Sequence, residues 1–434
     1  MHKKIINIGI IGFGNIGSNF YKILETNKKS IFLKTGKQPF VKYICAKNFK
    51  KKRKIKIPKK KFIKNPEILV KKNDVDIIIE LVGGAEGIAK KTVFSSLRNK
   101  KHVITANKSL IAKHGNKLAN VAQLNKVNLE YEASVAGGVP IIRSIKDGLI
   151  ANRISKIYGI LNGTTNFILS EMEKRKKEFR EILIEAKKLC FAETNPISDL
   201  NGNDAADKIR ILSSLAFNKL ISKNKIHISG IQNINLSDIT HAKNLGYKIK
   251  LLAISEIINN KLLERVHPCL VKKDSYIANI DGVLNAVIID GFPIGRTVLQ
   301  GEGAGPGPTC SSLISDLCSI MRGNIKYPFG VSSFVRNEIS KFDILKRSTS
   351  SYIRIEVKDL PGVLSSITHF FARNKISIKN LVQVPDKKNK KASIAIITHT
   401  TCEKNYQNLL KNLLKNKYVI KKPTFIRIEK IWWI

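Results

Sequence analysis

Acidic residues are scarce in this chain of 434 residues: 33 Asp and Glu stand against 77 Lys and Arg, which leaves a net charge of +44. An excess of this size is typical of nucleic-acid-binding proteins. Most of the basic residues are lysines, however, whereas base and phosphate recognition usually relies on the planar, bidentate guanidinium of arginine. Because isoleucine and asparagine are enriched together with lysine, the charge is better interpreted as a compositional bias spread over solvated surfaces, and we expect no nucleic-acid partner.

Cysteine pairs and long apolar runs are also lacking. The six cysteines are far apart and form no C-x-x-C pair, which argues against a zinc site and against a disulfide framework. No stretch approaches 18 consecutive apolar residues, and the N-terminus runs into a glycine motif without the features of a secretory signal. We therefore expect a soluble cytoplasmic protein with no membrane partner.

The remaining composition is that of a globular protein of about three domains. Hydrophobic residues make up 43% of the chain and charged residues 25%, which excludes general disorder. An apolar strand pattern over residues 4–11 ends at Gly12, and Ile16, Phe20 and Ile23 follow at helical spacing. Further short strands alternate with helices, so residues 1–140 are predicted to form a doubly wound, Rossmann-type α/β domain that binds a nucleotide.

The rest of the chain divides into two segments. Residues 141–345 mix helical patterns with strand-like stretches, which favours an α+β domain packed against the first. Residues 351–434 follow the order βαββαβ, which is the ferredoxin-like arrangement.

The sequence GFGNIG lies between the first strand and the first helix, where it is expected to bind a dinucleotide. Its glycines permit a tight turn, close approach to a pyrophosphate and close packing of the helix on the sheet. The predicted cofactor-binding residues here are Gly12, Phe13, Gly14, Asn15, Ile16 and Gly17.

The end of the second strand indicates which dinucleotide is bound. An acid there would bind the ribose 2′-hydroxyl of NAD, but this strand ends in Cys45, Ala46 and Lys47, with no acid before Glu67. We therefore predict that NADP(H) is preferred, with NAD(H) possible, and that Lys47 pairs with the 2′-phosphate, aided by a neighbour among residues 50–56. Lysine bias alone is the alternative explanation.

Charged side chains occur in otherwise apolar stretches at places where a substrate would meet the nicotinamide. Lys108 follows a buried strand directly, in TANKSLIA. Asp204 and Lys208 are four residues apart and share one face if DAADKIRILSSL is helical, and Glu193 and Asp199 lie in the loop before that helix. An exposed ion pair is the commonest reason for such spacing, but a lysine held beside an aspartate in a cleft can also act as a general acid.

Eight motifs, taken in order, resemble those of homoserine dehydrogenases of the larger, regulated kind. They are GFGNIG, DVDIIIELVGG, VITANKSLIA, YEASVAGGVPII, GILNGTTNFIL, AETNPISDLNGNDAADK, GEGAGPGPT and YIRIEVKDLPGVLSSI, and together they cover nearly the whole chain. The resemblance implies reduction of L-aspartate 4-semialdehyde to L-homoserine, in the pathway to threonine, methionine and isoleucine.

The resemblance also implies roles for individual residues. Lys208 matches the proton donor, Glu193 and Asp204 match substrate-binding acids, Asp199 orders the site, and Lys108 lies where cofactor and substrate meet. Gly303 would approach the cofactor. The family places a monovalent cation, Na⁺ or K⁺, on backbone carbonyls that match Glu132, Val135, Gly137 and Val139.

The last segment resembles an ACT domain, whose ligand loop matches residues 359–362. This implies feedback inhibition by L-threonine, with a purely structural role in dimerisation as the alternative, and the family implies a homodimer or homotetramer that dimerises through its middle domain. The chain departs from the family at Cys190 and Phe191, where Gly and Tyr are common, and at Asp207, a second acid beside Lys208.

Other interpretations remain open from the sequence. The chain could be another NADP-dependent amino-acid dehydrogenase of the same plan, a nucleic-acid-binding protein with a vestigial dehydrogenase fold, or an inactive amino-acid sensor.

Overall fold

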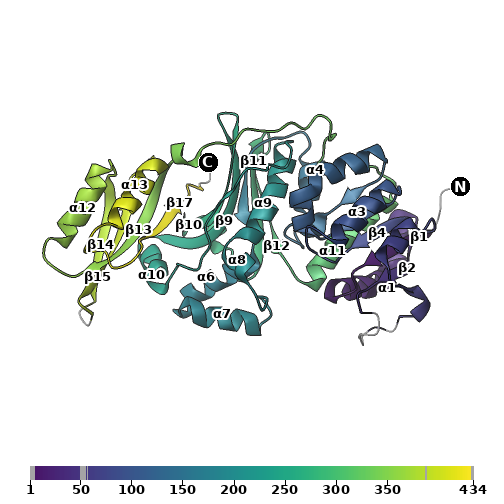
Figure 1. The fold of residues 1–434 in the computed structure, drawn as a ribbon, viewed down its shortest axis with the longest axis horizontal. Helices are drawn as coiled ribbons and strands as arrows, with labels where there is room; N and C mark the ends of the chain where they lie inside the picture. The colour runs from purple at the N-terminus through teal and green to yellow at the C-terminus, as the bar shows by residue number, and fades with distance from the viewer. Residues whose placement is uncertain (1–4, 49–54, 56, 387–388, 432–434) are drawn as a thin grey trace.

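The fold is described by a computed structural model that covers residues 5–48, 55, 57–386 and 389–431. Three groups of elements follow one another along an elongated molecule, with the N-terminal segment at one end and the C-terminal domain at the other (Figure 1). The fold class expected from the sequence is confirmed: a Rossmann-type sheet, a second mixed domain and a C-terminal ACT-like domain.

The N-terminal sheet has six parallel strands in the order β3-β2-β1-β4-β5-β6. Its central strands are mostly apolar because helices cover both faces of the sheet, and Ile8, Ile10 and Ile79 are fully buried. The strands are β1 (Ile5–Ile11), β2 (Gln38–Cys45), β3 (Phe62–Ile63), β4 (Ile77–Glu80), β5 (His102–Thr105) and β6 (Leu129–Glu130), and the helices are α1 (Asn15–Thr35), α2 (Pro66–Lys71), α3 (Ile88–Arg98) and α4 (Lys108–Leu124).

A later helix, α11 (Pro306–Met321), returns to this first domain. Its buried face joins the core beneath α1, and the Cys310 thiol lies 3.7 Å from the carbonyl oxygen of Ile16. The side chain of Asn128 also bonds to the backbone of Asn324 and Lys326. The expected boundary at residue 140 does not anticipate this return, because helical periodicity gives no information about which distant element a helix packs on.

The middle domain is built on antiparallel strands in the order β12-β11-β7-β9-β10. The stretches predicted as helices and strands, such as EILIEAKKL and LLAISEI, form α7 and β9. The strands are β7 (Arg153–Ile160), β8 (His227–Ile228), β9 (Tyr247–Ile258), β10 (Lys261–Lys272), β11 (Leu284–Phe292) and β12 (Gly295–Glu302), and the helices are α5 (Ile141–Arg143), α6 (Gly163–Arg175), α7 (Phe179–Lys188), α8 (Ile197–Leu200), α9 (Asn203–Ala216) and α10 (Leu236–Asn244).

The C-terminal domain has the predicted βαββαβ order, with a sheet ordered β17-β13-β15-β14. Its elements are β13 (Ser348–Lys358), α12 (Val363–Arg373), β14 (Ile378–Asp386), β15 (Lys391–Thr398), β16 (Thr401–Cys402), α13 (Glu403–Leu413) and β17 (Thr424–Ile428). None of the helices in the described residues is long and apolar enough to cross a membrane.

The C-terminal sheet continues the middle sheet, because β17 pairs in parallel with β10 at Cys269 and Leu270. Buried ion pairs hold this junction. Arg265 on β10 bonds to Glu256 on β9 and to Glu429 just beyond β17, and Arg347 also bonds to Glu429. The middle and C-terminal domains are thus joined by one continuous sheet and by largely buried ion pairs.

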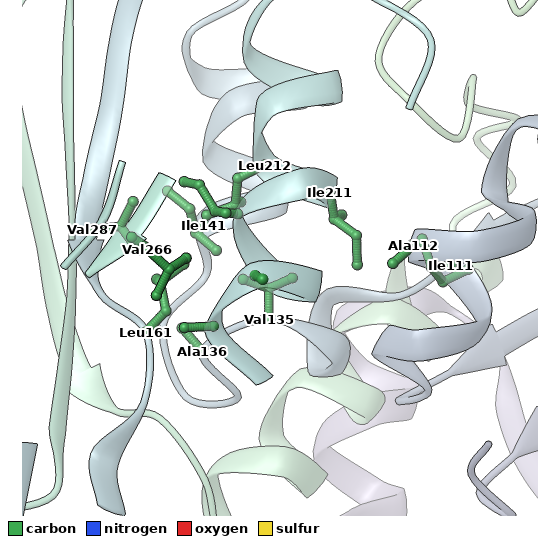
Figure 2. Packing of buried hydrophobic residues seen from close by; sticks show 14 of the residues in the cluster. Ile111, Ala112, Val135, Ala136, Ile141, Leu161, Ile211, Leu212, Val266 and Val287 are labelled. Carbon is green, nitrogen blue, oxygen red and sulfur yellow. The ribbon is translucent and has the colours of Figure 1, made fainter. Parts of the chain in front are cut away.

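One hydrophobic cluster spans the boundary between the first and middle domains. It contains Ile111 and Ala112 of α4 together with Ile211 of α9 and Val287 of β11. Figure 2 shows Ile211 lying beside Ala112, with Val135 nearby. The interface between the two domains is therefore packed core, which fixes α4 relative to α9.

We expect Glu429→Gln to lower the free energy of unfolding by about 3–5 kcal/mol, because it removes the carboxylate to which Arg347 bonds and one of the two that pair with the buried Arg265. Thermal and denaturant unfolding measure this effect. Glu338→Gln is the matched control. The side chain of Glu338 is 78% exposed, and its carboxylate lies 3.9 Å from the ammonium group of a lysine that is also exposed. Equal stability of the two variants would contradict the role assigned to the junction.

Candidate active site

The glycine loop after β1 has the geometry that a dinucleotide requires. Gly12 has a φ of 98°, and a Cβ there would lie 2.6 Å from the backbone of Leu81. A Cβ on Gly17 would lie 2.4 Å from the carbonyl oxygen of Gly12, so this glycine is needed for the close approach of α1 to the loop. Gly14 faces open space, and no described side chain caps the N-terminus of α1, so its N–H groups are suited to bind an anion.

The other predicted residues of this loop take different positions. Phe13 turns its ring into the core against Tyr21 and Phe62, so it can meet a cofactor only through its backbone. Asn15 is exposed at the start of α1. Lys47 is exposed just beyond β2, while residues 50–54 and 56 of the lysine run lie outside the described residues.

The loop that follows β4 is fixed by a fully buried acid that the sequence reasoning missed. Glu80 accepts hydrogen bonds from the backbone N–H groups of Val82 and Gly83, and from the hydroxyl of Thr105. Asn107 then donates to the carbonyl of Gly84 and caps the helix that begins at Lys108. The sequence signal that could have revealed Glu80 is the acid that directly follows the three isoleucines of DIIIE.

Asp204 holds two lysines from different domains. Its Oδ1 lies 2.7 Å from Nζ of Lys108 at the start of α4, and its Oδ2 lies 2.7 Å from Nζ of Lys208. Lys208 also donates to the carbonyl oxygen of Leu161 at 2.7 Å. The structure thus brings together the three residues that we predicted to be catalytic, and Asp204 is only 4% exposed.

The charges of this group depend on one another. Burial opposes ionisation of Asp204, but Lys208 and Lys108 outweigh it and hold the pKa of the carboxyl well below its usual value. Burial would likewise lower the pKa of Lys108, but the carboxylates of Asp204, Asp199 and Asp207 raise it above the ordinary value. The carboxylate form of Asp204 and the ammonium form of Lys108 are therefore both favoured.

Asp199 joins the same network through the loop after β7. Asn162 donates to Asp199 at 2.9 Å and to Asp204 at 2.9 Å, and Thr164 lies 3.4 Å from Asp199. Burial and the charge of Asp204 both raise the pKa of Asp199. Asn162 and Thr164 come from LNGTTNFIL, a cluster of Asn and Thr that can cap a helix while lining a pocket, and Asn162 does cap α6.

Glu193 is the predicted site residue that the structure leaves outside this network. It lies on the loop between α7 and α8, its side chain is exposed, and no group among the described residues bonds to it. Thr164 holds the loop close to the site by donating to the carbonyl oxygen of Phe191 at 2.6 Å.

The segment after β6 presents several buried backbone carbonyls. Those of Glu132, Gly137 and Val139 each accept one hydrogen bond, which leaves each oxygen a further lone pair, and no described group donates to the carbonyl of Val135. The carboxylate of Glu132 accepts the backbone N–H groups of Ile142 and Arg143. Oxygen donors of this kind fit a hard cation.

Gly303 packs against the same segment. A Cβ on Gly137 would lie 3.1 Å from the carbonyl oxygen of Gly303, and the N–H of Gly138 donates to Glu302. A Cβ on Gly303 itself would lie 2.1 Å from the side chain of Asn285, so a larger residue would have to displace that buried side chain. The loop that contains Gly303 leads into α11, and α11 packs on α1. Gly303 therefore lies between the carbonyl segment and α1.

Comparisons with known proteins cover the whole chain. Residues 140–318 match the family model described as Homoserine dehydrogenase, residues 12–132 match the Homoserine dehydrogenase NAD binding domain, and residues 351–417 match the ACT domain. The chain is 37% identical over 434 residues to the homoserine dehydrogenase of Neisseria gonorrhoeae, with 99% of each chain covered. The chain belongs to the homoserine dehydrogenase family.

Other homoserine dehydrogenases agree. That of Bacillus subtilis is 36% identical over 436 residues, covering 99% of this chain and 100% of its own. The crystal structure of the homoserine dehydrogenase from Thiobacillus denitrificans superposes with a TM-score of 0.90 at 34% identity, covering 98% of this chain and 99% of the other.

Membership in the homoserine dehydrogenase family confirms the resemblance carried by the eight motifs. The protein is an NAD(P)-dependent oxidoreductase that acts on a CH–OH group. This activity sets aside the alternatives of a vestigial dehydrogenase fold and of an inactive amino-acid sensor.

Proposed function

We propose that the enzyme reduces L-aspartate 4-semialdehyde to L-homoserine with NADPH, on the route to threonine, methionine and isoleucine, at the site around Asp204. The observation that carries this assignment is the buried carboxylate shared by Lys108 and Lys208 at the junction of the two domains. A carbonyl substrate that gains a hydride becomes an alkoxide and needs a proton, and a fixed ammonium group can supply it.

Lys208 is the proton donor in this proposal. An ammonium group has three N–H donors. Among the described residues, those of Lys208 meet Asp204 and the carbonyl oxygen of Leu161, which leaves one N–H for a substrate oxygen. The bound nicotinamide supplies the hydride. Asp204 and Leu161 together orient the Lys208 side chain, because two of its three donors are already fixed.

The remaining charged groups suit the two ends of an amino-acid substrate. Glu193 is exposed beside the site and would pair with the substrate ammonium group, while Asp199 orders Asn162 and the loop that carries it. Lys108 has one acceptor among the described residues, Asp204, and keeps further donors for substrate or cofactor.

A monovalent cation, Na⁺ or K⁺, is proposed on the carbonyl oxygens of Glu132, Val135, Gly137 and Val139. The support is the buried set of backbone oxygens with unused lone pairs. A cation there would hold the carbonyl oxygens of this segment together next to Gly303, and so stabilise the adjoining part of the cofactor site.

We expect Lys208→Ala to lower turnover of aspartate semialdehyde by about 10²–10⁴-fold, because the general acid is lost. The measurement is NADPH oxidation at saturating substrate, together with NADPH binding, which should persist. Lys188→Ala, an exposed lysine on α7, is the matched control. Turnover of the Lys208 variant within a few-fold of the unmodified enzyme would refute the assignment.

We expect Lys47→Ala to lower kcat/KM for NADPH roughly tenfold, the equivalent of one charge-assisted hydrogen bond. The value for NADH should not change, because NADH has no 2′-phosphate. Lys34→Ala, in the last turn of α1 and so far from the glycine loop, serves as the control. Equal catalytic efficiency of the unmodified enzyme with NADH and NADPH would overturn the proposed preference.

We expect millimolar L-threonine to inhibit the enzyme, and Asp359→Ala to relieve the inhibition while leaving basal activity intact. Asp359 and Leu360 are exposed in the loop between β13 and α12, and this loop is followed by a helix N-terminus that no side chain caps. Asp274→Ala, in an exposed loop of the middle domain, is the control. Full activity at millimolar threonine would favour a purely structural ACT domain.

Assembly as a homodimer or homotetramer is also part of the proposal. The strands at the two ends of the large sheet, β12 and β14, each have one side that no strand of the described chain covers. The cytoplasm stays the predicted compartment.

A further inference from the structure

A second contact joins α4 and α9 beside the lysine pair. The hydroxyl of Ser109 donates to Oδ2 of Asp207 at 3.0 Å, and both residues are half-buried. Each residue is the chain neighbour of a lysine in the site: Ser109 follows Lys108, and Asp207 precedes Lys208. Asp207 is also the acid by which this chain departs from the motif that it resembles.

The register of the two helices makes this contact part of a row. Asp204, Asp207 and Lys208 share one face of α9, since they are three and four residues apart. Ile211 continues that face and packs in the cluster with Ile111 and Ala112 of α4 (Figure 2).

The Ser109 hydroxyl therefore lies between an ion pair and an apolar contact. The first turn of α4 meets α9 through Lys108 and Asp204, then Ser109 and Asp207, and then the apolar residues.

We propose that the Ser109–Asp207 pair is a positioning device for catalysis, which fixes the rotation of α4 against α9 and adds a negative charge beside Lys108. The proposal rests on the proposed function of Lys108 and Lys208. A displacement of the lysines by as little as 1 Å would misalign them relative to the substrate, and this is costly in rate.

The two members of the pair act in separable ways. The hydroxyl contributes geometry alone, because it is neutral. The carboxylate contributes both an acceptor and a charge. The charged groups around Lys108 are the carboxylates of Asp204, Asp199 and Asp207 and the ammonium group of Lys208. The charge of Asp207 is one of those that raise the pKa of Lys108.

Two substitutions separate these contributions. Ser109→Ala removes the hydrogen bond and keeps the charge, and we expect kcat to fall roughly tenfold with no movement of the alkaline limb of the pH profile. Ser109→Thr keeps a hydroxyl and should restore kcat to within about twofold. Ser30→Ala, on the exposed face of α1, is the control.

Asp207→Asn keeps an acceptor oxygen for Ser109 and removes the charge. Loss of a nearby negative charge lowers the pKa of Lys108, so its ammonium form is lost at a lower pH. We therefore expect kcat near neutral pH to be largely kept and the alkaline limb of kcat/KM to move to lower pH.

Unchanged kcat in Ser109→Ala, or an unchanged alkaline limb in Asp207→Asn, would overturn the positioning proposal. Lys208→Ala measured alongside distinguishes this failure from failure of the proposed function. If that variant is inactive while both pair variants behave as the unmodified enzyme, only the positioning role is wrong; if it is active, the catalytic assignment itself fails. Thermal unfolding of each variant excludes loss of fold as the cause.

Discussion

The carboxylate of Asp204 is the constraint on which the rest of the site depends. A side chain only 4% exposed keeps its charge because two ammonium groups lie 2.7 Å from its two oxygens. One of these groups comes from the nucleotide domain and the other from the same helix as Asp204. The proposed site therefore forms only when α4 and α9 meet, and their meeting is stabilised by the charges that the proposed chemistry uses. Docking of the two domains and assembly of the group around Asp204 are one event.

The same helix also connects the site to the C-terminal domain. α9 lies on β9, where the hydroxyl of Ser255 donates to that of Ser213. β9 is paired along its whole length with β10, and β10 is the strand that pairs with β17. Glu429 bonds to Arg265 and Arg347 across this junction. A shift of the ACT domain would therefore disturb buried ion pairs on β10, the strand next to β9, on which α9 lies. These paired strands and ion pairs connect the ACT domain to the part of the sheet on which α9 lies.

Sequence reasoning found what local patterns encode. The glycine loop, the alternation of the first domain, the βαββαβ order of the last and the spacing of Asp204 and Lys208 all follow from neighbours within a few residues. The pairing of Lys108 with Asp204, the return of α11 to the first domain and the continuation of the sheet through β17 all depend on contacts between distant segments, and no periodicity encodes these contacts. Glu193 shows the opposite limit. The motif predicts it as a substrate ligand, but its side chain is exposed and bonds to no group among the described residues.

The scarcity of acids takes on a different meaning once the fold is known. A buried cation requires a counter-charge, whereas an exposed lysine does not. Glu429, Glu403 and Asp238 are almost fully buried, and each pairs with at least one arginine from another element. These three acids thus lie where their loss would remove a carboxylate from a buried arginine, whereas most of the lysines are at least partly exposed. A broad positive surface attracts any anion and so cannot select one. Under the proposed function, selectivity for a dinucleotide and an amino-acid substrate comes instead from a few groups, which are the start of α1, Lys47, and the two lysines on Asp204.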